Sequence, residues 1–276
     1  MFFIAVCGLS GSGKSYISRV LKKFLNKNNF NTKIISLDMF YKDFSEYSNE
    51  QKKNYKIAFS EENQKKNIRD KFIFNYDDPT LINTNRLIEI LTNIKKGKSI
   101  IKLPIYHFGK KNRTFKYENF TNTNCIIVEG LFLFYEIFNK YQNFFNYKIF
   151  VDVVDNLDKN KFNENSMFSY FAKNKNNEIQ IFLRRYYRDK STRKNNVKFL
   201  DYLYNWEYVM NSSRQYILPY KYLADIIINN NEEVELIDGK INYDNISNNI
   251  HIKLNNILED LNDMKKTMKN EKYFII

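Results

Sequence analysis

The stretch Gly8-Leu9-Ser10-Gly11-Ser12-Gly13-Lys14-Ser15 decides the fold class of this chain. It matches the phosphate-binding loop pattern, in which two glycines five positions apart are followed by Lys and Ser. The apolar run before it, residues 2–7, predicts a buried parallel strand. Apolar residues recur at helical spacing from Ile17 to Leu25 and predict a helix directly after the loop. This context indicates a protein that binds a nucleoside triphosphate.

The residue types of this loop suit the binding of phosphate. Glycines let the backbone bend tightly and turn its N–H groups inward, and the helix N-terminus adds the positive end of its dipole. We expect Lys14 to reach the outer phosphates and the Ser15 hydroxyl to ligate Mg²⁺. The nucleotide-binding residues expected from the loop are Gly8, Ser10, Gly11, Ser12, Gly13, Lys14 and Ser15.

Further apolar runs predict strands that extend the same sheet. They are residues 33–38, 125–130, 147–152 and 224–228, and the first two end at or beside the carboxylates Asp38 and Glu129. Helical patterns lie between them, at 81–96, around 184–189, near 197–213 and at 245–262. The chain therefore predicts an α/β protein with a doubly wound, mainly parallel sheet. In such sheets, ligands bind at the carboxyl ends of the strands.

The expected organisation is a single domain over residues 1–262, followed by a charged, frayed tail over 263–276. Residues of about 98–118 predict a β-hairpin that stands off the main sheet. An Asn/Lys-rich passage at about 155–180 is interpreted as a surface insertion.

Composition limits the classes of partner. Lys and Arg outnumber Asp and Glu by 44 to 31, but many lysines lie beside asparagines in polar runs and no nucleic-acid recognition motif accompanies the charge. We therefore attribute the charge to composition and expect no nucleic-acid partner.

Two cysteines in apolar runs, Cys7 and Cys125, predict buried thiols in a reducing compartment. No apolar run approaches the roughly 20 residues of a membrane span. The first strand starts at the initiator Met, so we expect a cytoplasmic protein without a leader peptide or membrane partner.

Several short motifs occur in one order along the first 230 residues. They are Gly8 to Ser15, residues 38–42 (DMFYK), 74–79 (FNYDDP), 103–106 (LPIY), 127–130 (IVEG), 150–152 (FVD), 184–189 (RRYYRD) and 218–225 (LPYKYLAD). In these motifs the chain resembles the uridine–cytidine kinases, within the wider uridine kinase/phosphoribulokinase group of P-loop kinases. The resemblance implies a kinase that uses ATP, or GTP, with Mg²⁺, and it suggests a homo-oligomer.

The resemblance also implies roles for individual residues. Asp38 matches the general base that takes the proton of the acceptor hydroxyl, a role that a carboxylate beside a phosphate loop can fill. Glu129 matches the acidic residue that joins Ser15 in holding Mg²⁺. Arg188 is expected to act with Lys14 on the charge that builds during transfer, and Arg184 and Arg193 to bind ATP from a lid. A helix cap for Asp38 and a solvated basic face for Arg184 and Arg193 are the structural alternatives.

The acceptor site is expected from six further matches. Asp77 matches the carboxylate that holds the ribose hydroxyls, with Tyr76 as an aromatic wall, and Arg185 matches an arginine that reaches the sugar. The expected acceptor-binding residues are Tyr41, Tyr76, Asp77, Tyr106, Phe108 and Arg185. For Tyr106 and Phe108, simple packing within the hairpin is an equal alternative.

The chain departs from the family where the family reads the nucleobase. Lys111 stands at a position where the family has histidine, Lys194-Asn195 replace Gly-Arg, and Leu203 replaces a glutamine. Because base readers supply discrimination and not phosphoryl transfer, the kinase chemistry is the firmer expectation. The expected reaction is phosphorylation of the 5′-hydroxyl of uridine or cytidine, as in pyrimidine salvage. The alternatives are a kinase for another ribosyl or sugar-alcohol substrate and a catalytically weak nucleotide-binding regulator.

Overall fold

The computed structural model describes the chain except for residues 68–69, 109, 142, 154–177, 192–198, 231–235, 238–239, 242–246 and 274–276. Most of the predicted insertion at 155–180 therefore lies outside the described residues. Its last three residues, 178–180, form the first turn of a helix. Within the described ranges, no helix is long and apolar enough to cross a membrane.

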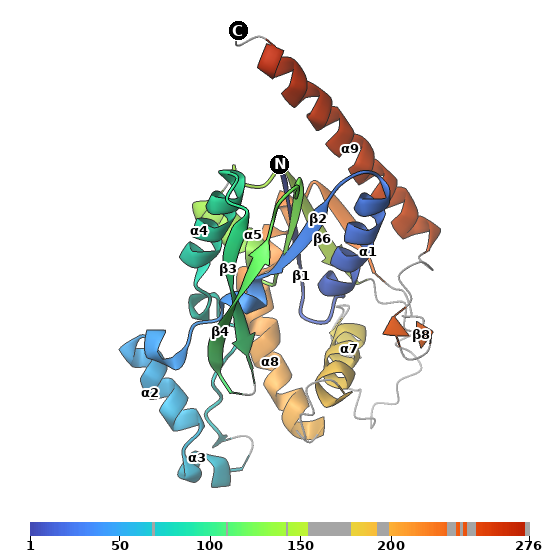
Figure 1. The fold of residues 1–276 in the computed structure, drawn as a ribbon. Coiled ribbons are helices and arrows are strands. Elements are labelled where there is room, and N and C mark those ends of the chain that lie inside the picture. The colour runs from blue at the N-terminus through green and yellow to red at the C-terminus, as the bar shows by residue number, and fades with distance from the viewer. Residues whose placement is uncertain are drawn as a thin grey trace.

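A parallel sheet of five strands lies at the centre of the described structure (Figure 1). The strands, in spatial order, are β2 (Thr32–Ser36), β5 (Cys125–Glu129), β1 (Phe2–Gly8), β6 (Tyr147–Asp152) and β7 (Ile226–Asn229). Val6 lies opposite Glu129 and Gly8 lies opposite Val151, so the strands end together at one edge. The predicted sheet is confirmed, with the phosphate loop leaving its central strand.

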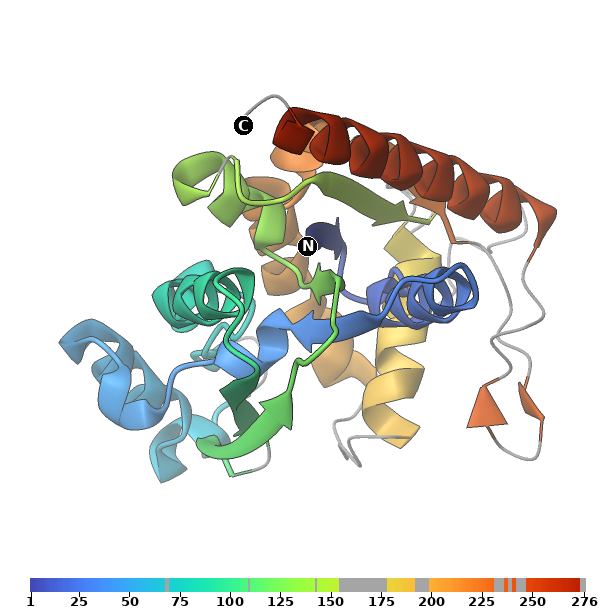
Figure 2. The ribbon, with the colours of Figure 1, turned by 45° about the horizontal axis from the view of Figure 1, so that its top comes forward.

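Helices cover both faces of the sheet, which explains why its strands are apolar throughout. Phe2, Ile4 and Val6 of β1 pack beneath α1 (Lys14–Lys27) and α9 (Asn248–Tyr273), which Figure 2 shows side by side. Phe3, Ala5 and Cys7 point to the opposite face. The helices on that face are α4 (Thr84–Lys95), α5 (Leu133–Lys140) and α8 (Phe199–Tyr216), with α7 (Glu178–Ser191) beside the loop.

The remaining elements extend from this three-layer body. The predicted hairpin is confirmed as β3 (Ile100–His107) and β4 (Asn112–Asn119), an antiparallel pair separate from the main sheet. The short helices α2 (Asn49–Ala58) and α3 (Glu61–Lys65) project beside it (Figure 1). Two short strands, β8 (Leu236–Ile237) and β9 (Lys240–Ile241), form a second small pair.

The structure corrects several predicted boundaries. The second strand ends at Ser36, and Asp38 lies in the 3₁₀ turn η1 (Leu37–Phe40), where its N–H donates to the Ser36 hydroxyl. The helix expected from residue 81 begins at Thr84, because Asn83 caps it and Pro79–Leu81 form a separate turn. The last strand runs from Ile226 to Asn229.

The frayed tail expected from residue 263 is also wrong, because α9 continues to Tyr273. Leu261 of this helix is buried and Met264 packs against the same apolar cluster, so core contacts hold the helix past residue 262. Cys7 and Cys125 are buried, free thiols, as predicted. Burial raises the pKa of the Cys7 thiol to about 11 and that of Cys125 to about 12.

Candidate active site

A cavity of about 720 Å³ opens where β1 and β5 end. It brings together residues from the phosphate loop, β5, η1, the segment after α3, the hairpin turn, α7 and α8. The predicted site residues that line it are Ser10, Lys14, Ser15, Asp38, Tyr41, Tyr76, Asp77, Phe108, Glu129, Arg185 and Arg188. Residues separated by up to 199 positions, from Ser10 to Val209, thus meet in one cavity.

The phosphate loop turns sharply before α1. Gly11 and Gly13 both have φ of 92°, in the left-handed region that favours glycine. A side chain at Gly13 would collide with the Asn230 amide, and a Cβ at Gly11 would lie 2.7 Å from the Ile181 carbonyl oxygen. The loop is therefore packed directly against α7 and the end of β7.

Lys14 is the first residue of α1, and its ammonium group bends back over the loop. Its Nζ donates to the Leu9 carbonyl oxygen at 2.8 Å, and the side chain is buried. Burial lowers the pKa of Lys14, whereas the nearby Glu129 carboxylate opposes that shift. Asp38 exerts the same opposing effect, which shows that it lies within electrostatic reach of Lys14.

Ser15 and Glu129 form a pair of oxygen donors beside Lys14. The Ser15 hydroxyl donates to Glu129 Oε2 at 3.1 Å, which links the start of α1 to the end of β5. A hydroxyl and a carboxylate suit Mg²⁺, which needs only one or two protein oxygens when phosphates and waters complete its shell. The described residues contain no group of three or more His, Cys, Asp and Glu side chains that could hold a metal ion.

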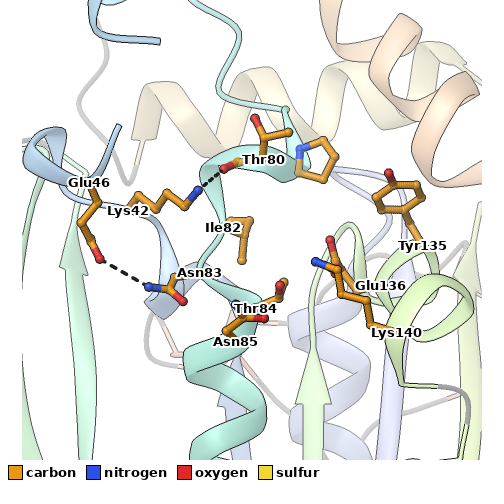
Figure 3. A pocket seen from close by; sticks show the side chains of 11 residues that line it. Lys42, Glu46, Thr80, Ile82, Asn83, Thr84, Asn85, Tyr135, Glu136 and Lys140 are labelled. Atoms are coloured by element: carbon orange, nitrogen blue, oxygen red, sulfur yellow. Dashed lines mark hydrogen bonds and ion pairs between the residues drawn. The ribbon is translucent and has the colours of Figure 1, made fainter. Parts of the chain in front are cut away.

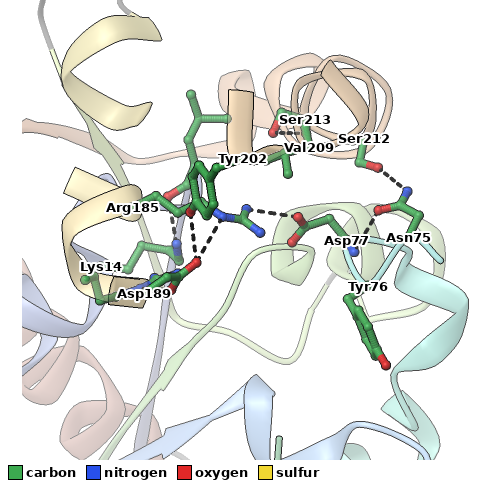
Figure 4. Close-up of polar contacts among 12 residues, drawn as sticks. Lys14, Asn75, Tyr76, Asp77, Arg185, Asp189, Tyr202, Val209, Ser212 and Ser213 are labelled. Carbon is green, nitrogen blue, oxygen red and sulfur yellow. Dashed lines mark hydrogen bonds and ion pairs between the residues drawn. The ribbon is translucent and has the colours of Figure 1, made fainter. Parts of the chain in front are cut away.

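A buried ion-pair network lies on the other side of the cavity (Figure 4). Arg185 Nη1 lies 2.9 Å from Asp77 Oδ2, and its Nε lies 3.9 Å from Asp189 Oδ2. The Tyr202 hydroxyl donates to Asp189 Oδ2 at 2.8 Å. Burial by itself would lower the pKa of Arg185, but the Asp77 and Asp189 carboxylates raise it above its usual value. The Arg185 side chain is thus fixed as a cation between two carboxylates.

Arg188 and Asn75 extend this network in opposite directions. Arg188 Nε donates to Asp189 Oδ1 at 3.0 Å, one turn of α7 beyond Arg185. Asn75 Oδ1 accepts the Asp77 N–H, and its Nδ2 donates to the Ser212 hydroxyl on α8. The loop that carries Asp77 is therefore bound to α8 as well as to α7.

Aromatic side chains line the end of the cavity away from the phosphate loop. The Tyr41 hydroxyl donates to the Tyr76 carbonyl oxygen at 3.1 Å, and the Tyr41 ring contacts Phe108 with centroids 5.3 Å apart. Tyr106 packs behind them, with its ring 5.4 Å from that of Tyr41, and it is not among the lining residues. Burial raises the pKa of Tyr76, so its hydroxyl stays protonated.

Lys111 lies in the hairpin turn at this aromatic end. Its backbone has φ of 50°, unusual for a residue with a side chain. Its ammonium group lies 3.4 Å from the ring centroid of Phe59, 4.7 Å from that of Tyr55 and 5.9 Å from that of Tyr76. In the described part of the chain no carboxylate pairs with it, so cation–π contacts hold this charge at the cavity wall.

Some predicted site residues lie outside the cavity lining. Arg184 Nη1 donates to the Asn230 carbonyl oxygen at 2.7 Å, and Arg193 lies outside the described residues. Gly8, Gly11, Ser12 and Gly13 shape the loop without lining the cavity. Lys42, which belongs to the motif at 38–42 but was not a predicted site residue, points into a separate groove of about 540 Å³, where it donates to the Thr80 carbonyl oxygen (Figure 3).

The structure adds residues that the sequence analysis did not select. Asp189 follows Arg185 by four positions on one helix, a spacing that would have suggested their contact. Tyr202, Trp206 and Val209 line the cavity from one face of α8. Their helical spacing is the same as that of residues that only pack in the core, so nothing in the sequence distinguished them as site residues.

Comparison with known proteins identifies the family. Residues 3–161 match the model of the Phosphoribulokinase / Uridine kinase family. The chain belongs to this family. Together with its phosphate loop and doubly wound sheet, this membership makes the chain a P-loop kinase.

Individual relatives differ in how much of the chain they share. The uridine kinase of Borreliella burgdorferi (strain ZS7) is 28% identical over 229 residues, which are 82% of this chain and 84% of that protein. The uridine kinase of Schizosaccharomyces pombe is 31% identical over 150 residues, 54% of this chain and 28% of that protein. The solved phosphoribulokinase of Rhodobacter spheroides has a TM-score of 0.48 and 14% identity, covering 82% of this chain and 68% of that one.

Proposed function

We propose that this kinase transfers the γ-phosphoryl group of ATP to the 5′-hydroxyl of a pyrimidine nucleoside. The observation that carries the proposal is the single cavity that Lys14, Asp38 and Asp77 share. A phosphate loop, a carboxylate and a site for a diol are the three parts that phosphorylation of a ribosyl alcohol needs. The uridine kinases among the relatives support the same acceptor class.

The donor end of the proposed reaction uses fixed positive charge. The loop N–H groups and the start of α1 would bind the phosphates, with Lys14 at the outer ones. Arg188 lines the cavity and would balance the charge that builds on the transferred group. Ser15 and Glu129 would hold Mg²⁺, which neutralises phosphate charge when it is bound.

Asp38 is the proposed base. It lines the cavity and lies within electrostatic reach of Lys14. A carboxylate next to the acceptor hydroxyl can accept its proton as the oxygen attacks phosphorus. Its place in a short 3₁₀ turn, held by the Ser36 hydroxyl, limits how far its backbone can move.

Asp77 and Arg185 are the proposed ribose-binding pair. Asp77 Oδ2 contacts Arg185, and its second carboxylate oxygen would accept hydrogen bonds from two neighbouring ribose hydroxyls. Because both side chains are already fixed by the buried network, little ordering cost remains when the sugar binds. The pyrimidine ring would then lie among Tyr41, Tyr76 and Phe108.

The charge of Lys111 favours one of the two pyrimidine nucleosides as the acceptor. An ammonium group only donates hydrogen bonds, so it would interact with a carbonyl oxygen of the base and not with an exocyclic amine. Both bases carry a carbonyl oxygen at position 2, but at position 4 uracil carries a carbonyl group and cytosine an amine, and we propose that Lys111 faces position 4. We therefore propose uridine as the preferred nucleoside.

The test is ATP turnover by the purified protein against uridine, cytidine, purine nucleosides and pentose phosphates. Saturable phosphorylation of uridine is expected. A Lys14→Met protein purified in parallel should be inactive, which would exclude a contaminating kinase. Turnover of another alcohol only would reassign the acceptor. Bound ATP without turnover of any acceptor would favour a nucleotide-binding regulator.

A further inference from the structure

A buried asparagine at the end of the last strand makes a contact with the phosphate loop that the sequence did not indicate. Asn230 follows β7, and its backbone N–H donates to the Asp152 carbonyl oxygen at 2.8 Å, beside the end of β6. Its side-chain Nδ2 donates to the Ser12 carbonyl oxygen at 2.8 Å, across 218 residues of sequence. Only 4% of Asn230 is exposed, and it does not line the active-site cavity.

This hydrogen bond fixes the direction of a loop peptide. A trans peptide is planar, so its C=O and N–H groups point to opposite sides. When Asn230 holds the Ser12 carbonyl oxygen, the Gly13 N–H is turned to the other side of the loop. Gly13 is the N-cap of α1, where free N–H groups bind phosphate.

The same residue also binds α7. Its main-chain carbonyl oxygen accepts from Arg184 Nη1 at 2.7 Å, and burial lowers the pKa of this arginine. The α7 helix carries Arg185 and Arg188, both of which line the cavity. Asn230 therefore links the phosphate loop to the helix that supplies the cavity's arginines.

The two polar atoms of the Asn230 side-chain amide differ in their hydrogen bonding. In the described structure Asn230 Oδ1 is buried without a hydrogen-bond partner, which is unfavourable for an amide. An apolar side chain would fill this place without that cost. The Nδ2 contact with Ser12 is thus the interaction that an asparagine provides and that a leucine of similar shape would lose.

We propose that Asn230 is a positioning residue for the nucleotide: it orients the Ser12–Gly13 peptide so that the loop is preorganised for the ATP phosphates. Asn230 does not contact the nucleotide itself. The proposal concerns the donor end only and holds whichever alcohol is the acceptor.

The experiment compares Asn230→Leu and Asn230→Asp, which keep the approximate shape and lose the amide donor, with Asn229→Leu as the matched control. Asn229 is the exposed neighbour at the end of β7. The dissociation constant of MgATP is measured by calorimetry, and KM for each substrate by steady-state kinetics. Thermal unfolding without nucleotide shows whether each variant is folded.

Asn230→Leu should weaken MgATP binding about tenfold, the effect of losing one buried hydrogen bond. The KM for the acceptor should stay within about twofold of the wild type, which a general loss of folded protein would not produce. Asn230→Asp should bind ATP more weakly than Asn230→Leu, because its carboxylate repels both the Ser12 carbonyl oxygen and the phosphates. Asn229→Leu should match the wild type.

Unchanged MgATP affinity in folded Asn230→Leu would overturn the proposal, as would an Asn230→Asp variant that binds ATP as well as the wild type. Asn230→Ala adds no bulk, so it replaces either variant that does not fold and should show the same tenfold loss. The assay reads ATP binding directly, so a wild-type protein that binds ATP but phosphorylates no nucleoside would contradict the proposed reaction and leave this inference testable.

Discussion

At the phosphate end of the cavity, Lys14 and Ser15 come from one continuous strand, loop and helix, whereas the proposed acceptor end is assembled from distant segments. Asp77 comes from a loop, Phe108 and Lys111 from the hairpin and Arg185 from α7. The phosphate end relies mainly on backbone N–H groups and a helix terminus. The acceptor end relies on side chains.

This difference has a functional consequence. Backbone geometry binds any nucleoside triphosphate in much the same way, so the phosphate end can be shared by a whole family. Side chains from separate segments can change one at a time, so the acceptor end can acquire a new preference while the transfer chemistry is kept. We propose Lys111, whose ammonium group lies 3.4 Å from the ring centroid of Phe59, as such a position in this chain.

The largest effect should come from Asp38, which lies where the two ends meet. Asp38→Asn should lower kcat by about 10²- to 10⁴-fold, because an amide cannot accept the hydroxyl proton. The dissociation constant of MgATP should change little, as measured by calorimetry. Asp70→Asn, at an exposed position, is the matched control and should keep full turnover. Normal turnover of Asp38→Asn would contradict the assignment of the base.

The second-largest effect should be on the stability of the fold. Arg185→Met leaves the buried Asp77 carboxylate without the cation that lies 2.9 Å from it, whereas Asp189 keeps Arg188, and it should destabilise the fold by about 3–5 kcal/mol. Adding Asp77→Asn should recover part of that loss, because one uncompensated charge is removed. Urea denaturation measures both variants. If the two losses simply add, the ion pair does not couple these residues.

A substitution of Lys111 should change the selectivity between uridine and cytidine. In Lys111→Glu a donor becomes an acceptor, so the ratio of kcat/KM for uridine over cytidine should fall about tenfold or more. MgATP binding should be unchanged, since the substitution affects only the acceptor end. Lys110→Glu makes the same charge change at an exposed neighbour and should leave the ratio alone. Equal ratios in both variants would show that Lys111 does not read the base.

The smallest effect should come from the anchor between the hairpin and the segment before α2. Arg113 pairs with Glu46 there. Burial by itself would raise the Glu46 pKa, but hydrogen bonds from Arg113 and the Asp43 N–H lower it overall. Because the folded-state pKa is depressed, this pair stabilises the fold above the ordinary carboxyl range, and the contribution is lost as the pH falls through the folded-state pKa.

Glu46→Gln should therefore cost at most about 1 kcal/mol at pH 7, since the pair is partly exposed. Its unfolding free energy should also depend less on pH between about 5 and 3 than that of the wild type. Urea denaturation across that range is the measurement. An identical pH dependence in the two proteins would mean that Glu46 contributes no acid-sensitive stability.

Local sequence patterns were enough to predict the sheet, the phosphate loop and the hairpin. Continuous apolar runs predicted β1, β5 and β6, because strands covered on both faces carry no polar alternation. The end of α9 could not be predicted in this way. Its last turns look polar, and the packing of Leu261 and Met264 into the apolar cluster beneath α9 is a tertiary contact that the local pattern does not record.

The candidate site also has one part that the sequence predicts and one part that it does not. The sequence by itself determined the phosphate end, since the spacing of Gly8, Gly13 and Lys14 already specifies a loop that binds phosphate. Only the tertiary structure brought Arg185 to Asp77, Lys111 to Phe59 and Asn230 to Ser12. Local patterns report neighbours one or two turns away in the chain. Contacts across fifty residues or more depend on how helices and strands pack, which no short pattern records.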